Sequence, residues 1–124
     1  MRILISNSSD EPIYTQIKDQ IKDQIIRGEL DAGVQLPSIR GLAKDLQISV
    51  ITSKRAYEEL EREGFVETIP GKGSYVAPQN KELIREQRLR IIEGSLMDVV
   101  REGKLLGLDY KELEEMLRIL FEEE

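Results

Sequence analysis

The sequence contains no cysteine and no histidine. These two absences exclude disulfide bonds, thiolate nucleophiles, imidazole bases and the usual ligands of zinc. The chain also lacks a glycine-rich phosphate-binding loop and a nucleophile motif, so an enzyme of this sequence would depend on carboxylates, lysines or tyrosines alone. We therefore predict a protein that is not an enzyme and that holds neither a metal nor a cofactor.

Long apolar runs are missing as well. The chain has no stretch of about 18 apolar residues that could cross a bilayer, and residues 1–10 lack the basic and apolar segments of a signal peptide. Hydrophobic residues make up 40% of the 124 positions and charged residues 34%, which is typical of a folded soluble protein. We expect a cytoplasmic protein with no membrane partner.

Positive charge is in deficit, because the formal net charge is −6. Such a balance argues against a polyanionic partner, since phosphate contacts need lysine or arginine. The deficit is uneven: residues 79–124 hold eight basic and twelve acidic side chains, whereas residues 1–78 hold ten and twelve. Between Leu36 and Arg55, Arg40, Lys44, Lys54 and Arg55 stand against Asp45 alone. The sequence therefore predicts a local positive surface on an acidic chain.

The N-terminal third predicts an arm followed by an amphipathic helix. Residues 1–10 show no clear period and indicate a short strand or an arm. After Pro12, which fits a first helical turn, isoleucines recur every fourth residue from Ile13 to Ile25, and Gly28 ends the pattern.

Two further short helices follow, and their spacing indicates a helix-turn-helix. Ser38 is the predicted N-cap of the first and Ser49 of the second, which stops at Gly64. Helices of this length joined by about three or four residues allow the second to project one face into a major groove. Their expected inward positions are Ile39, Leu42, Ala43 and Leu46 in the first helix and Ser53, Ala56, Tyr57 and Leu60 in the second.

A β-hairpin is predicted between Phe65 and Val76, with Gly71 and Gly73 on either side of Lys72 at its tip. A lysine between two glycines can approach a phosphate backbone closely, because neither neighbour carries a side chain. The alternative is an ordinary tight turn whose lysine keeps an edge strand soluble.

Beyond Pro78 the pattern changes to two helices. The first runs from Lys81 to Glu102, Gly103 and Gly107 flank a short break, and Asp109 with Glu112 forms the capping box of the second. Helices of this size cannot bury their apolar faces alone, so we predict self-association, with an intramolecular core as the alternative. The predicted dimerisation residues are Leu89, Ile92, Leu96, Val99, Val100, Leu113, Met116, Leu117 and Leu120.

The chain resembles the GntR family of bacterial regulators over roughly Pro12 to Val76. The matching positions are Leu36-Pro37-Ser38-Ile39-Arg40, Leu42-Ala43, Ile48-Ser49, Thr52, Arg55-Ala56-Tyr57, Leu60-Glu61, Glu63-Gly64 and Gly71-Lys72-Gly73-Ser74. The short remainder resembles the YtrA-like branch of that family. The resemblance implies a mainly α fold with a small β-hairpin: a winged helix-turn-helix over residues 1–78, followed by a two-helix C-terminal dimerisation element over residues 79–124.

The resemblance also implies which residues contact DNA. Carried over position by position, the contacts fall on Ser38, Arg40, Ser49, Val50, Thr52, Lys54, Arg55, Lys72 and Gly73. Two positions depart from the family pattern. Val50 stands where many relatives have arginine, so a polar contact is lost or is replaced by an apolar touch on a thymine methyl group. Lys54 also stands where arginine is common, and lysine cannot fork onto guanine in the same planar way.

The leading hypothesis is a homodimeric repressor that binds a palindromic operator in double-stranded DNA. A small-molecule effector is left open, with the C-terminal helices or their junction with the winged helix as its place. The alternative hypothesis is a winged helix that serves as a protein-interaction module without binding DNA, which the acidic balance favours. The glutamates from Glu58 to Glu63 point in several directions on one helix and are interpreted as a solvated face.

Overall fold

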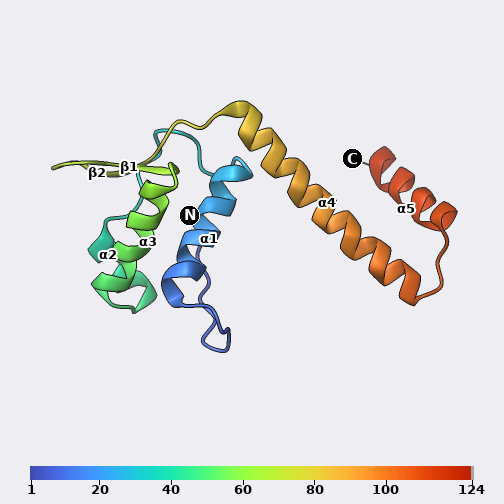
Figure 1. Cartoon of the computed structure of the whole chain (residues 1–124), viewed down its shortest axis with the longest axis horizontal. Coiled ribbons are helices and arrows are strands. Elements are labelled where there is room, and N and C mark those ends of the chain that lie inside the picture. Colours follow the sequence, from blue (N-terminus) through green and yellow to red (C-terminus); the bar gives the residue numbers. More distant parts are fainter. Residues whose placement is uncertain (124) are drawn as a thin grey trace. The chain divides into compact units, whose positions relative to one another are not determined.

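The computed structural model describes residues 1–123 and divides into two compact units, Met1–Ile84 and a second that begins at Arg85 (Figure 1). The division falls one turn after the start of the fourth helix, whereas the sequence analysis placed the boundary after residue 78. The predicted fold class, mainly α with a small β-hairpin, is confirmed. The elements are α1 (Ile13–Ile26), α2 (Ile39–Leu46), α3 (Val50–Arg62), β1 (Val66–Ile69), β2 (Gly73–Val76), α4 (Lys81–Leu105) and α5 (Tyr110–Glu123).

The core of the first unit forms where α3 packs against α1, α2 and the start of β1. Ile17 and Ile21 of α1 and Leu60 of α3 have no exposed surface. All four inward positions predicted for α3 are buried, whereas in α2 the two central ones, Leu42 and Ala43, are buried and the outer two are half-buried. The helical periodicity therefore predicted the core of the helix-turn-helix correctly.

Local signals set the helix boundaries. Ser38 and Ser49 cap α2 and α3 as predicted, their hydroxyl oxygens accepting hydrogen bonds from backbone N–H groups three residues later. Gly28 and Gly64 follow α1 and α3 with φ of 81° and 85°, the left-handed conformation that glycine adopts without a steric cost. The turn between α2 and α3 uses Gln47 at φ 56° instead, although a residue with a Cβ is strained there.

The wing is the two-stranded antiparallel hairpin of β1 and β2, and a third, irregular segment of the chain runs along its edge. Val66 of β1 pairs with Val76 of β2, and Ile69 pairs with Gly73. The chain that leads into α2 runs along the other side of β2, where Leu36 N donates to Ser74 O at 2.9 Å and Val76 N donates to Val34 O at 2.9 Å. This third segment, which the sequence analysis missed, ties the start of α2 to the wing.

The N-terminal arm is held on α1 by a ladder of three glutamines. Gln16, Gln20 and Gln24 each accept a hydrogen bond from a backbone N–H of the arm and donate one to the carbonyl of the same arm residue. Around Gln20, the distances are 2.8 Å from Leu4 N to Oε1 and 2.6 Å from Nε2 to Leu4 O. Four helical residues rise about 6 Å and two extended residues about 6.6 Å, so the two periods match.

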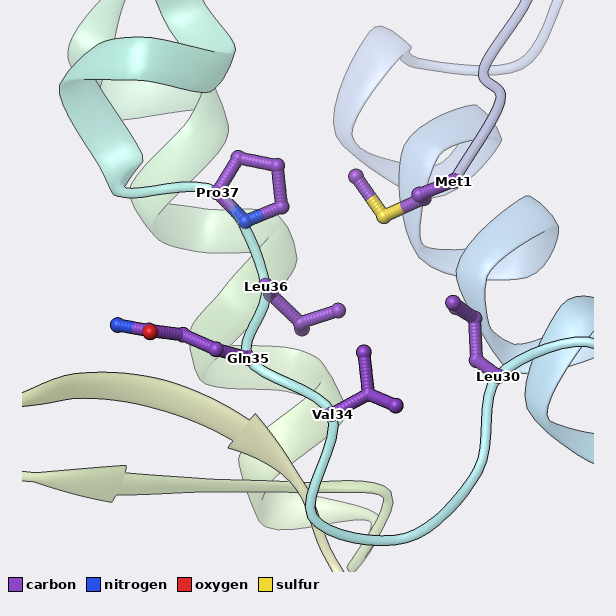
Figure 2. Close-up of a pocket in the computed structure, with 6 residues that line it drawn as sticks. All are labelled: Met1, Leu30, Val34, Gln35, Leu36 and Pro37. Carbon is purple, nitrogen blue, oxygen red and sulfur yellow. The ribbon is translucent and has the colours of Figure 1, made fainter.

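The ladder brings Met1 opposite the segment that precedes α2. Figure 2 shows the Met1 side chain facing Leu30, Leu36 and Pro37 across a hollow of about 420 Å³, which Val34 and Gln35 also line. Leu30 and Leu36 are buried, whereas Met1 is 46% exposed. The arm therefore forms one wall of an open hollow at the edge of the core.

The second unit consists of the remainder of α4, a tight turn and α5, which runs back in the opposite direction (Figure 1). The capping box is confirmed: Asp109 Oδ1 accepts from Glu112 N at 2.9 Å, and Glu112 Oε1 accepts from Asp109 N at 3.3 Å. The break predicted to begin at Gly103 is wrong, because α4 continues through this residue to Leu105. Gly103 is buried beneath Leu113 of α5, and a Cβ at this position would lie 3.0 Å from Leu113 Cδ1. This glycine allows close packing within the unit.

Candidate nucleic-acid interface

One groove joins the start of α2 to the tip of the wing. It has a volume of about 450 Å³, and its lining includes Ser38 and Arg40 from α2 with Lys72 and Gly73 from the wing. The structure therefore brings together four of the predicted contact residues, which come from segments more than thirty positions apart in the sequence. All four are exposed.

The tip of the wing is held in place through its backbone. The carbonyl oxygen of Lys72 accepts hydrogen bonds from Gln35 Nε2 at 3.0 Å and from the Tyr75 hydroxyl at 3.3 Å. These bonds fix the backbone of Lys72 and leave its ammonium group exposed. Sequence reasoning missed both positioning residues. Tyr75 lies within the predicted hairpin, and nothing in the local pattern marks it or Gln35 as a partner of Lys72.

The hydroxyl groups at the start of α3 already have structural partners. Ser49 Oγ accepts from Thr52 N at 3.1 Å and shares a hydrogen bond of 2.8 Å with Thr52 Oγ1, and Thr52 is half-buried. Capping therefore accounts for the presence of both residues without DNA. A capping hydroxyl keeps further hydrogen-bonding capacity, so a phosphate contact stays a prediction for Ser49 and Thr52.

Arg55 does not extend freely from α3. Its guanidinium carbon lies 3.9 Å from the centroid of the Tyr14 ring, a cation–π contact between α3 and α1. The contact limits the rotamers of an exposed arginine. Tyr14 is a second positioning residue that the sequence analysis did not identify.

The cations of this region lack carboxylate partners. Within residues 1–123, Arg40, Lys54 and Lys72 form no ion pair. Four other basic side chains of the first unit do have carboxylate partners: Lys18 and Lys22 share Glu63, Arg27 pairs with Asp23, and Arg62 pairs with Glu59. Hydrogen bonding to the Lys22 ammonium, assisted by Lys18, lowers the pKa of Glu63. Uncompensated positive charge is therefore present on α2, at the start of α3 and on the wing.

The tyrosine that links α3 to the start of α2 is buried. The Tyr57 hydroxyl donates to Pro37 O at 2.7 Å, immediately before the Ser38 cap. Burial raises the pKa of Tyr57 well above the usual range, so the phenol stays neutral and continues to donate this bond. The bond joins the core of α3 to the backbone that positions Ser38 and Arg40.

The predicted dimerisation residues form an apolar face on α4 and α5. Eight of the nine are 43% to 59% exposed, and the ninth, Leu113, is half-buried against Gly103 of its own chain. A hollow of about 370 Å³ includes Leu96 and Val100 of this face in its lining. The intramolecular contact thus accounts for Leu113 and leaves the other side chains uncovered in the single chain. No helix among residues 1–123 has the length and apolarity needed to cross a membrane.

Comparison with known proteins connects these features to one family. Residues 13–76 match the family model described as bacterial regulatory proteins, gntR family. The chain is 34% identical to the HTH-type transcriptional repressor YtrA of Bacillus subtilis, over 94% of this chain and 89% of that protein. The solved structure of YtrA from Sulfolobus acidocaldarius, a GntR-family transcription factor, is 34% identical and covers 97% of each chain with a TM-score of 0.58. A transcriptional regulator from Oenococcus oeni aligns over 94% of this chain and 97% of its own, at 27% identity and a TM-score of 0.70. The predicted resemblance to the YtrA-like branch is confirmed.

Proposed function

Because the chain belongs to the GntR family of bacterial regulatory proteins, we propose that it represses transcription by binding a palindromic operator in double-stranded DNA as a homodimer. The observation that carries this proposal is the uncompensated positive charge around the groove between α2 and the wing. The similarity to a repressor over nearly the whole of both chains supports the direction of regulation.

In the proposed complex, each winged helix contacts DNA with three parts. The first turn of α3 enters the major groove, as the second helix of a helix-turn-helix does. Ser38 and Arg40 meet phosphates at the start of α2, where the helix dipole and the free N–H groups also favour negative charge. Lys72 contacts the backbone in or beside the minor groove. Phosphate contacts set the position of the protein, and base contacts from α3 select the sequence.

The apolar face on α4 and α5 supplies the second half of the proposal. Its exposed side chains would be costly to leave in water, and a second copy of the chain offers a surface of the same chemistry. One winged helix reads only a few base pairs, so pairing two copies about a two-fold axis matches an inverted repeat and increases specificity. Repression then follows by exclusion, because a dimer on an operator that overlaps a promoter blocks access to the same DNA.

A gel-shift titration tests this function. The probe is a set of genomic fragments from the source organism, selected for binding by the purified full chain. We expect an inverted repeat among the selected fragments and an affinity that falls as salt rises. Arg40→Ala should remove two phosphate contacts per dimer, so the fall of log K with log salt should become less steep by about 1.8.

Arg27→Ala is the matched control, since it removes the same charge from a residue already paired with Asp23. Circular dichroism should show unchanged folding for both variants. Equal operator binding by Arg40→Ala and Arg27→Ala would refute the assigned face. A chain without affinity for any duplex at low salt would instead be a protein-interaction module.

Two hollows are candidate places for a small-molecule effector. The hollow on α4 includes Leu96 and Val100, so we assign it to the dimer rather than to an effector. The hollow beside Met1 is the other candidate, and it lies within the winged-helix unit instead of among the C-terminal helices. A thermal-shift screen of the Met1→Ser variant against the parent chain would separate the two places.

A further inference from the structure

The start of α3 exposes two apolar side chains side by side. Ile51 is 80% exposed, more than any other large apolar side chain in residues 1–84, and Val50 is 47% exposed. A solvent-facing isoleucine contributes nothing to the core and leaves most of its apolar surface in water. The capping of α3 by Ser49 does not require a hydrophobic residue at either of the next two positions.

Helix geometry directs Ile51 away from the protein. At about 100° per residue, position 51 lies on the face of α3 opposite the buried Ser53, Ala56 and Leu60. The residues that share this outer face near the start of the helix include Lys54 and Arg55, both exposed. Ile51 is therefore the most prominent side chain on the face that the proposed function places in the major groove.

The major groove presents one apolar group, the C5 methyl of thymine. A branched aliphatic side chain can neither donate nor accept a hydrogen bond, so against guanine, cytosine or adenine it would leave a polar base edge without a partner. Against thymine it covers the methyl group and removes apolar surface of both partners from water. The side chain and the base edge are thus matched in chemistry.

We propose that Ile51, with Val50 beside it, reads thymine methyl groups, so that each operator half-site carries T·A pairs where the first turn of α3 enters. This assignment rests on the proposed function and deepens it by naming the base that α3 selects. The uncompensated charges of Arg40, Lys54 and Lys72 in the same unit favour nucleic acid over an apolar protein partner.

Removal of single methyl groups from the operator tests the assignment. Starting from a selected genomic fragment, deoxyuridine replaces thymidine at one symmetric pair of positions at a time, which deletes the methyl group and keeps the base pairing. We expect one or two positions in each half-site where every methyl removed weakens binding by about fourfold. Replacement at all other thymines should leave affinity unchanged.

The protein side of the test uses Ile51→Ala. This variant should bind the thymine and uracil versions of the sensitive positions equally well. Leu4→Ala, which shortens another exposed apolar side chain, on the N-terminal arm, should keep the full methyl effect. Fragments that bind tightly but show no uracil-sensitive position would overturn the inference, as would full methyl sensitivity in Ile51→Ala. Absence of all duplex binding would instead refute the proposed function.

Discussion

The proposed dimer makes a quantitative prediction for Leu96. This side chain is 46% exposed in the single chain, so a second copy that covers it would bury roughly half of its surface. Burying a whole leucine side chain contributes about 1.5–3 kcal/mol, and the remaining half about 1 kcal/mol. A symmetric interface contains the residue twice, so Leu96→Ala should weaken the dimer by about 2 kcal/mol, a rise of roughly thirtyfold in its dissociation constant.

Sedimentation velocity over a concentration series measures this constant directly. Asp98→Ala is the control, because Asp98 is two residues along α4 and points to nearly the opposite side from Leu96. The same preparations should then be titrated with a full palindrome and with a single half-site. Leu96→Ala should lose affinity for the palindrome at concentrations where the dimer dissociates and keep its affinity for the half-site. A parent chain that is monomeric throughout, or an unchanged constant in Leu96→Ala, would refute the interface.

Single contacts in the first unit support four other predictions. Tyr14→Leu removes the ring beneath the Arg55 guanidinium and should raise the operator dissociation constant about two- to fivefold in fluorescence anisotropy; an unchanged constant would mean that the ring does not position the charge. Gln47→Gly relieves a left-handed backbone and should add about 1 kcal/mol to the free energy of unfolding in urea, whereas a lower value would contradict the strain. Burial raises the pKa of Tyr57 in the folded chain, so as the pH rises the unfolded chain loses its phenol proton first, at about pH 10. The contribution of the neutral phenol to folding stability is complete below that pH and is lost as the pH rises above it. Tyr57→Phe should therefore reduce the fall in melting temperature at alkaline pH, measured by thermal melting. Gln20→Ala deletes two hydrogen bonds to the N-terminal arm and should cost about 1 kcal/mol, with faster hydrogen exchange of the arm amides; unaltered exchange would show that the ladder does not hold the arm.

Features with a local cause could be predicted from the sequence. The period of four in α1 and the inward positions of α3 follow from which residues face the core of a helix. Ser38, Ser49 and the box at Asp109 each satisfy N–H groups only three residues away, so the pattern that marks them is short. The predicted contact residues at α2 and at the wing tip were found in this way or through the family resemblance, before their shared groove was known.

Features that depend on contacts between distant segments could not be predicted. The glutamine ladder needs a helix and an arm to lie side by side, and three glutamines four residues apart otherwise look in the sequence like an ordinary polar face. Gln35 acts on the wing 37 positions further along the chain. Gly103 was interpreted as a helix end because glycine favours such positions, whereas here its missing Cβ makes room for Leu113. In each case the partner, not the residue type, determines the role.

Affinity and specificity are expected to reside in different residues of this interface. Arg40 and Lys72 face phosphates in the proposed complex, and phosphates are the same for every sequence, so their contribution cancels when two DNA sites are compared. The family resemblance implies an arginine contact at the position of Val50, and an arginine there would carry both charge and base recognition. With valine at this position and Ile51 exposed beside it, we expect part of the base recognition at the start of α3 to depend on apolar contact. Salt should therefore change how tightly the chain binds while leaving its preference for thymine intact, because a methyl group carries no charge to screen.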